Sequence, residues 1–286
     1  MPSRSQNQSR FSESETEAYY DAEDALYRSF WDAEGSLHWG VFTSDPQSGP
    51  DGSIRDSFLT ACSRLNQIML ENSGIGSGSH VLDLGCGNGN TSLWLCQTTG
   101  ASVTGIDLSG VRIDNATQSL AEYPDLASRV AFHKASATDL PFEENTFTHV
   151  WSQATIYHVP DKTTTLEEAY RVLQPGGFMV FDDLTKPRPD ISDEARTFVY
   201  DRLLFDTDFS FYSYMDALRE TGFKVLDARD LSTHLAHSYT CLSRMAATGN
   251  DPERRERFAA LSDAYLKMVN AVHHEELGWA QYRCVK

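Results

Sequence analysis

Residues 80–90, HVLDLGCGNGN, decide the fold, because an apolar run ends there in a carboxylate and then breaks into three glycines. Val81, Leu82 and Leu84 predict a short buried strand, with Asp83 near its end. The three glycines predict a turn whose backbone takes positive φ and lets a ligand approach main-chain N–H groups. The stretch therefore predicts a ligand-binding loop at the end of a strand.

The spacing of the glycines indicates which ligand the loop binds. Gly85, Gly87 and Gly89 stand at every second position, whereas a dinucleotide fingerprint needs G-x-G-x-x-G. No Lys-Ser/Thr pair follows, as a phosphate-binding loop would require. The spacing therefore favours a nucleoside without a phosphate.

A second carboxylate follows the next predicted strand, ASVTGI at 101–106, and this is Asp107. At the tip of the second strand of a doubly wound sheet, a carboxylate can accept hydrogen bonds from both hydroxyls of a ribose. Together, VLDLGCGNGN and VTGIDLS resemble the first two motifs of class I S-adenosylmethionine-dependent methyltransferases. The resemblance implies an α/β fold, a doubly wound Rossmann-like mixed sheet of seven strands, with S-adenosylmethionine as cofactor.

The rest of the chain continues the alternation of strands and helices. Further strands are expected at 130–134, 147–152, 178–181 and 224–230, and helices at 57–72, 91–98, 112–123, 166–173 and 251–272. The run LQPGG at 173–177 resembles the family's signature before strand five and is expected to stop a helix and turn the chain.

The ends of the chain extend this core. Tyr20, Tyr27 and Trp31 fall on helical spacing ahead of the sheet, which predicts an added lid or a helix that simply packs on the core. We therefore divide the chain into a disordered tail, a helical lid with a lead-in helix, the α/β domain and a C-terminal helix. Their bounds are 1–14, 15–72, 73–245 with an acceptor-site insertion at 186–220, and 246–286.

Composition excludes several classes of function. The formal net charge is −17, and such a surface repels phosphate backbones, so no nucleic acid partner is expected. The five cysteines lack C-x-x-C or Cys/His spacing, which argues against a disulfide framework or a structural zinc. No apolar run is long enough for a membrane span, and the first residues lack the core of a signal peptide. We expect a cytoplasmic, metal-free monomer or homodimer whose partner is a small molecule.

The donor site follows from these motifs and from the strand ends. Asp83 is expected to meet the ammonium of the methionine part, unless it only caps the turn, and Asp107 the ribose. In the resembling family an acid usually precedes the alanine of the turn over the adenine, where this chain has Ser136. The expected cofactor-binding residues are Asp83, Gly85, Gly87, Asp107, Leu108, Ala137, Thr138 and Gln153.

The acceptor half carries a more specific resemblance. YYDAEDALYRSFWDAEGSLHWGVF, SQATIYHVPDKTTTLEEAYRVLQPGGFMVFDD and VYDRLLFDTDFSFYSYMDALRETGF are similar to sarcosine/dimethylglycine N-methyltransferases of betaine synthesis. This implies in-line methyl transfer to a small amine, for which positioning matters more than a strong base. The alternatives are O- or C-methylation of a small natural product, sterol or prenyl lipid, or a protein that binds S-adenosylmethionine without catalysis.

An amine acceptor needs an aromatic, water-poor pocket, which lowers the amine pKa because it disfavours the charged form. A substrate carboxylate needs a cation or a hydrogen-bond donor, for which His158, Arg171 and Arg202 are candidates. His158 at the end of strand four is the expected base or partner, and His38 a lesser one. The candidate catalytic residues are His158 and Tyr20, and the substrate-binding residues are Trp39, Tyr157, Tyr212 and Arg202.

Overall fold

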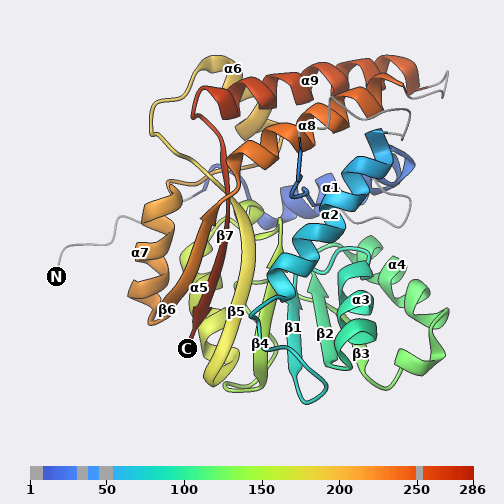
Figure 1. Cartoon of the computed structure of the whole chain (residues 1–286), viewed down its shortest axis with the longest axis vertical. Helices are drawn as coiled ribbons and strands as arrows, with labels where there is room; N and C mark the ends of the chain where they lie inside the picture. Colours follow the sequence, from blue (N-terminus) through green and yellow to red (C-terminus); the bar gives the residue numbers. More distant parts are fainter. Residues whose placement is uncertain (1–8, 31–37, 45–53, 249–253) are drawn as a thin grey trace.

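The computed structural model describes residues 9–30, 38–44, 54–248 and 254–286. Its centre is a seven-stranded sheet in the order β3-β2-β1-β4-β5-β7-β6 (Figure 1). The first five strands in this order run parallel, whereas β7 is antiparallel to both of its neighbours. The strands are β1 His80–Leu84, β2 Ser102–Asp107, β3 Val130–Lys134, β4 Phe147–Gln153, β5 Leu173–Thr185, β6 Lys224–Asp230 and β7 Gly278–Val285. The predicted mixed sheet is confirmed.

Helices cover both faces of this sheet, because successive side chains of a strand point to opposite faces. Val81 packs in a cluster with residues of α2, α3, α8 and α9, while Leu82 and Leu84 pack in another with residues of α5 and α7. The helices are α1 Glu13–Phe30, α2 Ile54–Leu70, α3 Asn90–Thr99, α4 Gly110–Ala121, α5 Lys162–Val172, α6 Asp193–Ala195, α7 Phe211–Thr221, α8 Ser232–Ala247 and α9 Arg255–His273.

Three helices gather beyond the carboxyl ends of the parallel strands, where α1 lies beneath the pair α8 and α9 (Figure 1). A short π-helix, η4 Arg196–Asp201, continues α6 in the same region. The insertion at 186–220 thus contributes α6, η4 and most of α7. In the described parts of the chain, no helix has both the length and the apolar character needed to cross a bilayer.

Two expectations about the chain ends change. Residues 246–286 are not only a helix, because after α9 the chain enters the sheet as β7 between β5 and β6. Residues 9–14 do not belong to the expected disordered tail, since α1 begins at Glu13 and the backbone N–H of Arg10 donates to Asp206, while residues 1–8 lie outside the described residues. The side chain of Tyr27 lies in the core, whereas Trp31 lies outside the described residues.

Candidate active site

A cavity of about 1050 Å³, here called the first cavity, lies at the carboxyl ends of β1, β2 and β4 and is covered by α1. Its walls come from the loops that follow these strands, as expected for an open α/β sheet. Most of the predicted site residues meet here: Tyr20, Asp83, Gly85, Gly87, Asp107, Leu108, Ala137, Gln153 and His158. Thr138 stands behind the wall, where its hydroxyl lies 2.8 Å from that of Ser136.

The glycine loop is held against β2, because the backbone N–H groups of Gly85 and Cys86 both donate to the carbonyl of Ile106 at 2.8 Å. Gly85 has φ +81°, and a Cβ there would lie 2.2 Å from the side chain of Thr155. Gly87 has φ +53°, and a Cβ there would meet nothing within 4 Å. Gly85 is therefore required by packing, whereas the absent side chain of Gly87 leaves space in the first cavity.

Asp107 joins the loops after β1 and β2. Its carboxylate oxygens accept from the backbone N–H groups of Gly87 and Ser109, each at 2.9 Å. A carboxylate offers about four lone-pair sites, so two remain for a ligand. The carboxylate is thus positioned by backbone donors and still able to accept from paired hydroxyls.

Asp83 lies deeper, with only 2% of its surface exposed. Its carboxyl accepts from the Ser92 hydroxyl at 2.5 Å. Burial raises the pKa of Asp83 to about 7, although the Ser92 bond lowers it. A cation placed beside this carboxyl would favour its ionised form and recover part of the cost of burial.

Helix α1 closes the first cavity through a row of acidic side chains at helical spacing. Each of them binds a strand end, loop or helix at the carboxyl edge of the sheet. The pairs are Glu13 with Ser136 and Thr138, Glu17 with Lys134, Asp21 with Ser109, and Asp24 with Asn88 and Asn115. Helix α1 therefore lies over the first cavity and is attached by polar contacts.

Tyr20 and His158 meet at the inner end of the first cavity, where the Tyr20 hydroxyl hydrogen-bonds Nε2 of His158. The Arg112 guanidinium lies 3.9 Å from the centre of the Tyr20 ring. Burial, with the positive charges of Arg112 and Lys162, holds the pKa of His158 well below its usual range. Burial also raises the pKa of Tyr20 to about 12. Both groups are therefore uncharged at neutral pH.

This arrangement predicts how stability depends on pH. An unfolded histidine takes up a proton below about pH 6.5, whereas folded His158 does not, so the folded state loses stability as pH falls through that value. Replacing His158 with glutamine should reduce the loss between about pH 7.5 and about pH 5.5 by about 1.4 kcal/mol. Urea unfolding at the two pH values measures it, with exposed His273→Gln as the control. Equal losses in wild type and His158→Gln would contradict the prediction.

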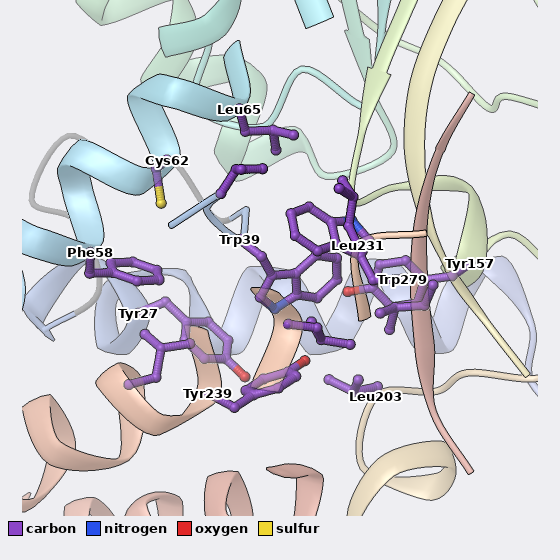
Figure 2. Packing of buried hydrophobic residues seen from close by; sticks show 14 of the residues in the cluster. Tyr27, Trp39, Phe58, Cys62, Leu65, Tyr157, Leu203, Leu231, Tyr239 and Trp279 are labelled. Atoms are coloured by element: carbon purple, nitrogen blue, oxygen red, sulfur yellow. The ribbon is translucent and has the colours of Figure 1, made fainter. Parts of the chain in front are cut away.

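A second cavity, of about 390 Å³, lies beside the first, and Tyr20 lines both. Figure 2 shows part of its wall, where rings of Tyr27, Trp39, Tyr157 and Tyr239 gather. Its lining residues are Tyr19, Tyr20, Tyr27, Trp39, Tyr157, Arg202, Leu203, Tyr239 and Tyr265. Three of the predicted substrate-binding residues, Trp39, Tyr157 and Arg202, therefore meet in one aromatic cavity.

Arg202 is the charged residue in this wall. Its Nε donates to the carbonyl of Phe198 at 3.1 Å, and its Nη2 lies 2.7 Å from the sulfur of Met268. The guanidinium also lies 5.4 Å from the ring centre of Tyr265. Among the residues that the structure describes, Arg202 forms no ion pair with a carboxylate. An arginine set among tyrosines in this way can receive an anion from outside.

Three other predicted candidates lie elsewhere or have other partners. The structure does not bring Tyr212 to either cavity, because its side chain is 72% exposed on α7. Arg171 pairs with Glu168 at 2.7 Å and donates to carbonyls of the β3–β4 loop, so its role is structural. His38 lines the first cavity, with Nδ1 3.0 Å from the carbonyl of Trp39.

Sequence reasoning missed several residues of the site. Tyr239 and Tyr265 come from α8 and α9, and Asn88 of the glycine loop and Arg112 of α4 both contact Asp24 of α1. Two tyrosines of the second cavity carried a signal: Tyr27 through the aromatic spacing of α1, and Tyr265 through its place on the apolar side of the C-terminal helix. The described residues hold no group of three or more His, Cys, Asp or Glu side chains arranged to bind a metal ion.

Comparison with known proteins identifies the family of the chain. Residues 82–181 match the methyltransferase domain family. The chain is 30% identical to (+)-O-methylkolavelool synthase of Herpetosiphon aurantiacus, over 77% of this chain and 74% of that protein. It is 28% identical to the sarcosine/dimethylglycine N-methyltransferase of Halorhodospira halochloris, over 90% and 88%.

A solved structure shows the same fold. It comes from Galdieria sulphuraria, with TM-score 0.79 and 22% identity over 93% of this chain and 98% of that one. By name, the curated relatives include N-, O- and C-methyltransferases.

Proposed function

Because the chain belongs to the class I S-adenosylmethionine-dependent methyltransferases, we propose that it methylates a small amine that carries a carboxylate, of the sarcosine or dimethylglycine kind. The amine nitrogen attacks the methyl carbon in line, the carbon–sulfur bond breaks, and S-adenosylhomocysteine leaves. The nitrogen must be unprotonated when it attacks. The protein therefore has to bind the donor, hold the amine in its neutral form and align the two.

The first cavity suits the donor. Asp107 would accept from the two ribose hydroxyls, and Asp83 would face the ammonium of the methionine part. Gly87 leaves room for close approach, and Leu108, Ala137 and Gln153 complete the wall. Thr138 supports the wall from behind through its bond to Ser136. When bound, the donor supplies an electrophilic methyl group on a sulfonium.

The two loop glycines give a matched test of this placement. Gly87→Ala should fold with a loss of about 1 kcal/mol for its positive φ, and should weaken S-adenosylhomocysteine binding about 10-fold, because its methyl group occupies ligand space. Gly85→Ala should lose stability by about 2 kcal/mol or more, because its Cβ would overlap Thr155. Calorimetric binding and urea unfolding separate the two effects. Unchanged affinity in Gly87→Ala would contradict the placement.

The observation that carries the acceptor proposal is that Arg202, which pairs with no carboxylate among the described residues, lies in an aromatic cavity that shares Tyr20 with the first cavity. A substrate carboxylate would pair with the guanidinium, as arginine favours. The second cavity is the smaller of the two, which suits a compact acceptor. The tyrosine and tryptophan rings suit the methylated ammonium product.

The surroundings also favour a neutral amine. Arg112, Lys162 and Arg202 all lower the pKa of His158, in a protein whose net charge is −17. The same positive charges and the loss of water would lower the pKa of an amine held beside His158. The imidazole of His158 stays neutral there and adds no positive charge of its own, and its hydrogen bond with Tyr20 holds the ring in place.

Transfer of a labelled methyl group tests the proposal. The acceptor panel holds sarcosine, dimethylglycine, dimethylaminoethanol, a phenol and a prenyl alcohol. We expect label in sarcosine or dimethylglycine, and at least about 100-fold less in dimethylaminoethanol, which has the same tertiary amine as dimethylglycine but no carboxylate. Label confined to the phenol or the prenyl alcohol would replace the proposal with O- or C-methylation.

A further inference from the structure

We propose that Glu13, on the lid helix α1, recognises the 6-amino group of the donor's adenine and so selects adenosyl over other nucleosides. The inference rests on the donor placement proposed above. Glu13 lines the first cavity, although it stands more than seventy residues before the glycine loop in the sequence. The contacts of Glu13 and the order of the strands in the sheet support this assignment.

The sheet order sets the direction of the donor. The strands that bear the site lie in the order β3, β2, β1, β4. The methionine part points toward Asp83 on β1, and the reacting methyl toward Tyr20 and His158 beyond β4. With the ribose at Asp107, on the tip of β2, the base must extend toward the tip of β3.

The lining of that end suits a flat base. Leu108, Ala135 and Ala137 present apolar surface, and the acidic groups there are Glu13 and Glu17 of α1. Glu17 is engaged by the ammonium of Lys134 at 2.5 Å. Glu13 has no cation within ion-pairing distance among the described residues. Of the two carboxylates, Glu13 is therefore the one available to the polar edge of the base.

Two hydroxyls hold Glu13 in place. Oε1 accepts from Ser136 at 2.6 Å and from Thr138 at 3.2 Å, both on the loop after β3. Within the described parts of the chain, no hydrogen bond to Oε2 is found. The carboxylate is thus fixed through one oxygen, and its other oxygen is left for the ligand. Ser136 and Thr138 are positioning residues in this arrangement.

The chemistry predicts selectivity. A carboxylate accepts hydrogen bonds and does not donate them, so it pairs with an amino group and repels a carbonyl oxygen. A base with an oxygen at position 6 would place its own acceptor opposite the carboxylate of Glu13, and no hydrogen bond could form between them. Sites built around a hydrogen bond to the ligand reject analogues that cannot form it. Wild-type protein should therefore prefer the 6-amino ligand by about 30-fold.

Calorimetric binding of S-adenosylhomocysteine and of S-inosylhomocysteine, its 6-oxo analogue, tests the inference. Wild type should show the 30-fold preference, and Glu13→Gln should reduce it below about 3-fold, because an amide can donate to the oxo group. Glu17→Gln, on the same helix and in the same cavity wall, should keep the wild-type ratio.

The possible outcomes separate the two proposals. If Glu13→Gln weakens both ligands equally, or leaves both unchanged, Glu13 only attaches the lid and the inference is wrong. If S-adenosylhomocysteine binds Asp107→Ala as tightly as wild type, the donor placement itself is wrong. The glutamine variants should unfold at the same urea concentration as wild type, which shows that differences in affinity do not come from lost stability.

Discussion

Replacing Asp107 with alanine is expected to weaken S-adenosylhomocysteine binding by at least about 100-fold, or about 2.7 kcal/mol. The carboxylate would form two charge-assisted hydrogen bonds to the ribose, each worth about 1.5 to 3 kcal/mol. It also holds the backbone N–H groups of Gly87 and Ser109, which would lose their acceptor. The loss therefore has two sources, the missing ribose contacts and a looser glycine loop. Calorimetric titration measures the sum.

A second aspartate provides the control for this variant. Asp114 is exposed on α4, seven positions after Asp107, and Asp114→Ala should bind the ligand as wild type does. Asp107→Asn keeps the shape of the side chain and one acceptor oxygen, so its affinity should fall between those of wild type and alanine. Wild-type affinity in Asp107→Ala would show that the nucleoside binds elsewhere.

Replacing Arg202 with methionine should lower kcat/KM for dimethylglycine by about 100- to 1000-fold. Methionine keeps an apolar stem among the tyrosines but removes the cation, so the acceptor carboxylate would be buried without a partner. Breaking a buried charge pair in this way costs about 3 to 5 kcal/mol. With dimethylaminoethanol, which has no carboxylate, the variant should match or exceed wild type. Steady-state methyl transfer to the two acceptors measures the difference.

Arg219 offers the matched control. It lies on α7 with an exposed side chain paired to Asp216, so Arg219→Met should leave both acceptors unaffected. Arg202→Met should also bind S-adenosylhomocysteine as wild type does, which shows that the first cavity is intact. An equal loss with both acceptors would contradict a role for Arg202 in carboxylate binding.

That the residues proposed for the donor lie together could be predicted, because they are close in the sequence. Asp83 and the glycine loop belong to one strand and turn, and Asp107 closes the next strand, which pairs with the first in register. Strand ends in parallel sheets meet at one edge, so spacing along the chain is enough to place these side chains. In the structure they line one cavity.

The second cavity, proposed for the acceptor, depends on packing between remote segments. Tyr27, Tyr239 and Tyr265 come from α1, α8 and α9, and no local pattern indicates that these helices meet. The prediction that Tyr212 lines the acceptor pocket chose the wrong side of helix α7. Tyr214, two positions later and about 200° around the helix, is buried and donates to Asp183 at 3.0 Å, while Tyr212 faces solvent.

The last strand could not be predicted for a similar reason. β7 carries Gln281 and Arg283 between apolar residues and follows α9 after a short turn, so its sequence resembles the end of an amphipathic segment. Its place between β5 and β6 is fixed by antiparallel pairing on both sides. The pairing also brings Trp279 against Trp39, at 5.7 Å between ring centres, so the strand supports the aromatic core beside the second cavity.

The most direct test of the account is a crystal structure with S-adenosylhomocysteine and dimethylglycine bound together. We expect the ribose on Asp107 and the acceptor carboxylate within hydrogen-bonding distance of the Arg202 guanidinium. The acceptor nitrogen should lie beside Tyr20 and His158, in line with the donor sulfur. A nucleoside outside the first cavity, or an acceptor whose carboxylate lies away from Arg202, would contradict it.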